Sequence, residues 1–228
     1  MMQHKISAVL LFLLVPAAMI ACILLQSLQT ALLSTLVLLA ALTPFFLAFE
    51  RQKPRSRDFM PVVVLTALSV TGRLLFAALP NFKPVSAIVI LAGVCFGRQS
   101  GFLTGTLSAL VSNLFFGQGP WTPWQMYAWG LMGYVAGALA STKLFRRPWA
   151  VLLYGFLASF GYGFLMNSWT LFSFVQPVTW QAALATYGAA LAFDATHAVS
   201  TVAFLSVTLL PWQKELRRIR QKYGVREL

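Results

Sequence analysis

Apolar residues run along this chain in long blocks, and short polar segments separate the blocks. A block of about 20 residues suits an α-helix that crosses a hydrocarbon core of about 30 Å, because each residue advances the helix by about 1.5 Å. Membrane β-strands would instead alternate apolar and polar positions, whereas residues 6–25 and 30–49 are almost continuously apolar. The pattern predicts an all-α, polytopic membrane helix bundle of eight spans, near residues 6–26, 29–49, 59–79, 85–97, 101–116, 124–142, 149–166 and 180–210.

Two of these blocks, 85–97 and 101–116, are shorter than a full span. They fit two short, packed spans, which we favour, or one re-entrant hairpin that enters from outside. Small residues recur at every fourth position on two of the predicted helices: Gly101, Gly105 and Ala109 on one, and Gly133, Gly137 and Ser141 on the other. This spacing lets helix backbones approach closely, so we expect both helices to pack tightly inside the bundle.

Basic residues orient the spans, because Lys and Arg stay on the cytoplasmic side. With both termini cytoplasmic, every basic cluster faces the cytoplasm, and only Arg73 within a span and Lys83 in an outer loop remain. The chain then divides into a transmembrane hairpin with a basic loop (1–58) and a six-helix core with a basic C-terminal tail (59–228). The first block also fits a cleaved signal peptide, but a second block follows at once, which favours a retained hairpin.

Composition excludes several classes of function. Hydrophobic residues make up 59% of the chain and charged residues 10%, with a mean hydropathy of +0.76, which is typical of a membrane protein. The formal net charge of +12 comes from short clusters at the ends of apolar blocks, so we expect a lipid bilayer and no nucleic acid as partner. Cys22 and Cys95 each lie inside an apolar block and provide neither a disulfide framework nor a metal site.

The sequence also lacks the motifs of an enzyme. No hydrolase elbow, zinc-protease motif or phosphate-binding glycine loop is present, and five acidic residues are too few for a metal-dependent site in the membrane. We therefore expect no catalytic residues, no metal ligands and no cofactor in this chain. If it drives uptake against a gradient, a partner must hydrolyse the ATP.

The outer loops are rich in aromatic rings and amides and nearly free of charge. The segment Gly117–Trp124 (GQGPWTPW) combines glycines and prolines, which shape a loop, with two tryptophans. An interfacial aromatic belt is the plain alternative for these tryptophans. Because irregular backbone must face water or a cavity, we favour a binding site. The predicted substrate-binding residues are Asn81, Phe82, Lys83, Gln118, Trp121, Thr122, Trp124, Tyr127, Asn167 and Trp169.

Polar residues inside spans mark a second feature, because an ionised group in lipid costs at least about 2.5–3.5 kcal/mol. Asn113 is one such residue, and Asp194 and His197 share a helix face because they are three positions apart. Arg73 and Asp194 are predicted to form a structural pair that joins two helices. The alternatives are a polar floor for an outward pocket, or a proton relay through Asp194 and His197.

From about residue 59 onward, the chain resembles the substrate-binding S component of an energy-coupling factor (ECF) vitamin transporter. Five segments carry the resemblance: Ala67–Arg73, Pro80–Pro84, Ala92–Gly97, Ser108–Asn113 and Phe116–Met126. Within that family, the GPWTPW loop is most similar to members assigned to cobalamin uptake.

The resemblance implies six core helices and an outward-facing vitamin pocket in the plasma membrane of a prokaryote. The chain would capture cobalamin outside and topple in the membrane to release it inside. Its partners would be a transmembrane coupling protein (T component) and two cytoplasmic ATPase subunits. The family's Ala-x-x-x-Ala coupling motif would fall on Ala67 and Thr71, where the threonine departs from it.

Cobalamin suits the predicted site. It has a large ring system that aromatic side chains can contact, a rim of amides that amide side chains can bond, and a phosphate that a cation such as Lys83 can bind. His197 lies too deep in the last helix to be an easy cobalt ligand. Three other interpretations stay open: an S component for another vitamin, a stand-alone proton-coupled permease that uses Asp194 and His197, and a membrane scaffold without a small ligand.

Overall fold

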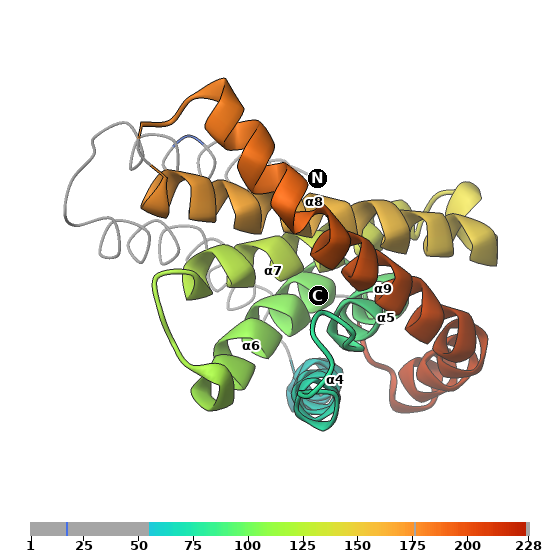
Figure 1. Cartoon of the computed structure of the whole chain (residues 1–228). Helices are drawn as coiled ribbons and strands as arrows, with labels where there is room; N and C mark the ends of the chain where they lie inside the picture. Colours follow the sequence, from blue (N-terminus) through green and yellow to red (C-terminus); the bar gives the residue numbers. More distant parts are fainter. Residues whose placement is uncertain (1–16, 18–54, 176, 227–228) are drawn as a thin grey trace.

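The computed structural model describes residues 17, 55–175 and 177–226. Over 55–226 the chain is helical, with six α-helices, one short 3-10 helix and no strand among the described residues. Figure 1 shows their arrangement. The elements are α4 (Ser56–Leu75), α5 (Val85–Phe96), α6 (Arg98–Phe116), α7 (Thr122–Leu139), η2 (Leu144–Arg146), α8 (Pro148–Phe174) and α9 (Trp180–Tyr223). The six-helix core is thus confirmed, whereas the predicted hairpin of 1–58 lies almost wholly outside the described residues.

Local sequence explains where these helices begin and end. Gly97 adopts a φ of 96°, which side chains disfavour, and this one residue separates α5 from α6. Gly117 ends α6 in the same way at a φ of 98°. Pro148 lies in the first turn of α8, where its missing N–H is harmless. The side chain of Thr179 caps α9 by accepting a hydrogen bond from the Ala182 N–H (3.2 Å).

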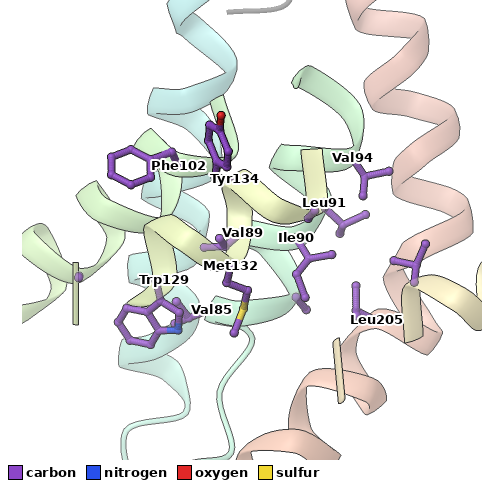
Figure 2. Close-up of a cluster of buried hydrophobic side chains, with 14 of the residues drawn as sticks. Val85, Val89, Ile90, Leu91, Val94, Phe102, Trp129, Met132, Tyr134 and Leu205 are labelled. Carbon is purple, nitrogen blue, oxygen red and sulfur yellow. The ribbon is translucent and has the colours of Figure 1, made fainter. Parts of the chain in front are cut away.

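Helix α5 lies at the centre of the bundle. All twelve of its residues are buried, and it contacts α4, α6, α7, α8 and α9. Figure 2 shows its side chains between Trp129 and Met132 of α7 on one side and Leu205 of α9 on the other. With a length of about 18 Å it is too short to cross the hydrocarbon core alone. Its apolar sequence therefore serves protein packing and not lipid contact.

The predicted close packing of the glycine-rich helices is confirmed. An added Cβ at Gly101 would lie 2.7 Å from the Gly133 carbonyl carbon, and one at Gly105 would lie 2.7 Å from the Gly130 nitrogen. Gly137 meets the Arg98 backbone in the same way, at 2.6 Å. Helices α6 and α7 therefore cross with their backbones in contact, as small residues at every fourth position allow.

Three described helices, α4, α8 and α9, are long and apolar enough to cross a membrane. Two of them run past their predicted ends at residues 166 and 210. Helix α8 continues to Phe174, and the Ser168 hydroxyl within this extension donates to the Phe164 carbonyl (2.7 Å). Helix α9 continues through Pro211 to Tyr223, and its red C-terminal part bends in Figure 1. The eight spans and the cytoplasmic termini stay predictions.

Candidate substrate-binding site

A chain of hydrogen bonds joins four helices around Asn113. The Arg73 guanidinium of α4 donates from Nη1 to the Asn113 side-chain oxygen (2.8 Å) and to the Ser112 hydroxyl on α6. The Asn113 amide in turn donates to the side-chain oxygen of Gln125 on α7 (2.8 Å), and the Gln125 amide donates to the Tyr162 hydroxyl on α8 (2.9 Å). Asn113 is only 1% exposed, so its amide is satisfied entirely within the protein.

Tyr162 links this chain to a second buried group. Its ring stacks on Trp129 with centroids 5.0 Å apart and meets the His197 ring edge-on at 4.9 Å. The Ser86 hydroxyl accepts from the Trp129 indole N–H (3.1 Å) and shares a 2.7 Å hydrogen bond with His197 Nε2. One polar and aromatic network, which we call the internal network, therefore runs from Arg73 to His197 through all six helices.

The Gly117–Trp124 segment, predicted as a loop, is irregular up to Trp121 and then forms the first turn of α7, and its own side chains hold it in shape. The Gln118 amide donates to the Leu110 carbonyl (2.9 Å), and the Gly119 N–H donates to the Thr122 hydroxyl (3.2 Å). Thr122 also accepts from the Asn113 amide (3.1 Å), which ties the loop to the internal network. Of the predicted site residues here, Gln118 is exposed and Trp121 half-buried.

Other predicted aromatic residues divide into surface and core. Trp121 meets Trp169 of α8 edge-on, with ring centroids 5.9 Å apart, and Trp169 packs against Phe174 in the same way at 5.3 Å. Trp124 and Tyr127 are instead 7% and 4% exposed and belong to the hydrophobic core of α7. Trp124 and Tyr127 could therefore contact a ligand only if it reached past the surface loop into the helix bundle.

The loop between α4 and α5 brings the remaining predicted residues together. Asn81 has a positive φ of 53° and donates to the Phe193 carbonyl of α9 (3.4 Å). The Phe82 ring packs between Phe76 and Phe204, at centroid distances of 6.4 Å and 5.4 Å. Lys83 donates to the Leu79 carbonyl (3.0 Å), which turns its ammonium back over the loop.

The predicted Arg73–Asp194 pair is wrong. Arg73 bonds to α6, whereas Asp194 accepts a 2.9 Å hydrogen bond from the Asn167 amide of α8 and lies against Gly163. Within the described residues, the one ion pair joins Arg218 and Glu215 at 3.6 Å. The prediction paired two opposite charges that lie within spans, but in the structure the neutral amides of Asn113 and Asn167, each on an adjacent helix, supply the partners.

Sequence reasoning missed several members of the internal network. Gln125, Trp129 and Tyr162 lie within blocks interpreted as plain spans, and Ser86 lies at the start of another. An amide within an apolar block is a signal of the same kind that marked Asn113. Gln125 could have been found in this way, whereas Trp129 and Tyr162 resemble any other core aromatic residue.

The opposite end of the bundle has an apolar groove of about 890 Å³ between α4 and the C-terminal part of α9. Its lining includes Met60, Val64 and Leu68 of α4 and Trp212 of α9. The predicted coupling residues Ala67 and Thr71 are exposed on α4 beside this groove. In the described part of the chain, no three His, Cys, Asp or Glu side chains gather in a way that would hold a metal ion.

Fold and site together define a helical membrane protein with one internal network beneath shaped loops, an arrangement that suits a membrane transporter. Residues 56–213 match the protein family described as "ECF-type riboflavin transporter, S component", and the chain belongs to this family. No curated protein and no solved structure matches the chain.

The family match confirms the resemblance to an ECF S component, a vitamin-transporting, substrate-binding membrane subunit. It also confirms that the chain is a transporter subunit and not an enzyme. S components work together with a T component and ATPases. The vitamin in the family's description is riboflavin and not the cobalamin expected from the loop.

Proposed function

We propose that this chain captures a vitamin outside a prokaryotic cell and delivers it across the plasma membrane, while partner subunits hydrolyse ATP. The internal network beneath the Gly117–Trp124 loop carries this proposal, in a chain that belongs to the S-component family. Aromatic side chains at the surface and in the core would contact the flat conjugated ring of the vitamin, and amide side chains would hydrogen-bond to the polar groups at the edge of that ring.

Two vitamins are candidates for the ligand, each on its own observation. Cobalamin or a related corrinoid comes first, because the GPWTPW loop resembles cobalamin-assigned members and Trp121 and Trp169 form a half-buried aromatic pair beside it. Riboflavin is the second candidate, because the matched family is described as a riboflavin transporter. Equilibrium binding of both vitamins to the purified chain distinguishes the two.

The coupling partner would dock on α4. Val63, Val64, Ala67, Leu68 and Thr71 form an exposed stripe of apolar and small side chains on this helix, next to the apolar groove. Small residues on such a stripe let a partner helix approach closely. We propose that a T component contacts Ala67 and Thr71, and that it carries two cytoplasmic ATPase subunits.

Uptake into proteoliposomes tests the transport mechanism. The chain reconstituted with a T component, two ATPases and internal ATP should accumulate labelled vitamin, whereas the chain alone should bind it without accumulation. Accumulation by the chain alone, driven by a pH gradient, would instead support the permease interpretation. That alternative is disfavoured because Asp194 and His197 bond to different partners, Asn167 and Ser86.

A further inference from the structure

Two cations lie beside the same aromatic ring on the outer side of the candidate site. The Arg73 guanidinium carbon is 4.6 Å from the centroid of the Phe116 ring, and the Lys83 ammonium is 5.9 Å from it. Arg73 also lies 5.1 Å from the centroid of the Trp129 ring in the internal network. We call these three side chains the cation group: Arg73 from α4, Lys83 from the following loop and Phe116 from the end of α6.

The cation group has no carboxylate to balance it among the described residues. Asp58 accepts hydrogen bonds from the backbone N–H groups of Arg55 and Arg226, at the other end of α4. Asp194 is bonded to Asn167, and Glu215 pairs with Arg218. The three described acids are thus all bonded elsewhere.

The two charges also act on each other. Burial, and after it the positive charge of Arg73, lowers the pKa of the Lys83 ammonium. Like charges held together in a partly desolvated place destabilise the protein unless a negative group joins them. The aromatic ring offsets only part of this repulsion, because a cation–π contact is weaker than an ion pair with an anion.

Both cations have donors to spare. The hydrogen bonds of Arg73 to Ser112 and Asn113 both leave from Nη1, so the other guanidinium nitrogens can serve a ligand. The Lys83 ammonium has three N–H donors, of which one meets the Leu79 carbonyl. A planar guanidinium and a nearby ammonium match the several free oxygens of a phosphate.

We propose that Arg73 and Lys83 form an anion subsite that binds a phosphate group of the transported vitamin. This proposal rests on the proposed function and adds the chemical class of the ligand, which would be a phosphate-bearing vitamin. Riboflavin carries no phosphate and would leave the cation group uncompensated. The nucleotide loop of a corrinoid carries a phosphodiester, and a phosphorylated flavin carries a phosphomonoester, so both sources can be tested.

Paired ligands that differ in phosphate provide the experiment. Binding of cobalamin is compared with binding of cobinamide, which lacks the whole nucleotide loop including its phosphate. Flavin mononucleotide is compared with riboflavin, which differs by the phosphate alone, and all ligands are tested on the purified full chain in nanodiscs. We expect one of the two pairs to bind. Within that pair, the phosphate-bearing ligand should bind at least tenfold more tightly than the phosphate-free one, and this difference in affinity should shrink at high salt.

Variants assign that preference to the two cations. Lys83→Gln should reduce the preference for the phosphate-bearing member at least fivefold, because it removes one of the two cations that would face the phosphate. Arg73→Gln should do the same, and Lys83→Gln keeps the test decisive if loss of the Arg73 bonds to α6 prevents folding. Lys143→Gln, in the exposed turn after α7, is the matched control and should leave the preference unchanged.

The outcomes separate the two proposals. If one pair binds with no preference for phosphate, or if Lys83→Gln retains the full preference, the anion subsite is wrong and vitamin binding stands. If no member of either pair binds, the anion subsite fails together with the proposed ligand classes.

Discussion

At the scale of single residues, the site is a set of side chains that already satisfy one another. Asn113 uses its amide oxygen on Arg73 and its amide nitrogen on Thr122 and Gln125. Such a network fixes the orientation of each member before a ligand arrives, so less conformational entropy is lost on binding. Residues with a free face, such as Trp121 and Trp169, are then the ones that can contact a ligand directly.

Trp121→Ala should weaken vitamin binding by about 1–3 kcal/mol, because it removes one half-buried aromatic contact beside the loop. Equilibrium titration of the purified variant measures this loss. Trp149→Ala is the control, since Trp149 is 51% exposed at the start of α8 and should leave affinity unchanged. Equal affinities for the Trp121 variant and the wild type would remove this residue from the site.

Trp124→Ala should also weaken binding, on the same scale of about 1–3 kcal/mol, but it should in addition lower stability because Trp124 is only 7% exposed. Thermal unfolding of the purified protein, followed beside the titration, separates the two effects. A variant with unchanged thermal stability would contradict the core position of this side chain.

At the scale of elements, backbone contact between α6 and α7 fixes the positions of the two helix ends that the Gly117–Trp121 loop connects. Gly133→Ala places a Cβ 2.9 Å from the Gly101 Cα, closer than real Cβ atoms come. We expect a loss of about 1–3 kcal/mol in stability from the overpacked crossing. Gly161→Ala is the matched control, because a Cβ there meets nothing within 4 Å. Thermal unfolding in detergent compares the two, and equal midpoints would contradict the close crossing.

Helix α4 carries the second element-scale prediction. Ala67→Leu should abolish or strongly reduce ATP-driven uptake, because the added bulk blocks close approach of a partner helix, while vitamin affinity stays at the wild-type value. Uptake by the reconstituted complex and binding to the chain alone are measured together. Ala189→Leu, also exposed but on α9, should transport normally. Normal transport by the Ala67 variant would place the docking face elsewhere.

At the scale of the whole molecule, apolar block length predicted most of the described helices. The glycine spacing also predicted that two of the helices pack closely, because only small residues let backbones touch, and the structure shows that these two helices are each other's partners. The ends of α8 and α9 were predicted too early, because the end of an apolar block is not the end of a helix: polar residues after position 166 and basic residues after position 210 continue the helices without a break.

The candidate site was predicted less completely than the fold. Loop composition predicted Gln118, Trp121 and Lys83 as ligand contacts, and these stay predictions. The side chains that support them depend on how the helices rotate against one another, which a single sequence does not reveal. The Arg73–Asp194 error has this origin, since opposite charge says nothing about which face each helix turns inward. Tyr162 was missed for the same reason, whereas Gln125 carried a usable signal, an amide within an apolar block.

The central claim is that the Gly117–Trp124 loop borders a vitamin site open to the outside of the cell. Labelling tests it most directly: Gln118, which is exposed, is replaced by Cys after Cys22 and Cys95 have been replaced by Ser. A membrane-impermeant maleimide is then applied to intact cells with and without cobalamin or riboflavin. We predict rapid labelling that one of the two vitamins slows, whereas labelling only after the membrane is permeabilised would contradict the account.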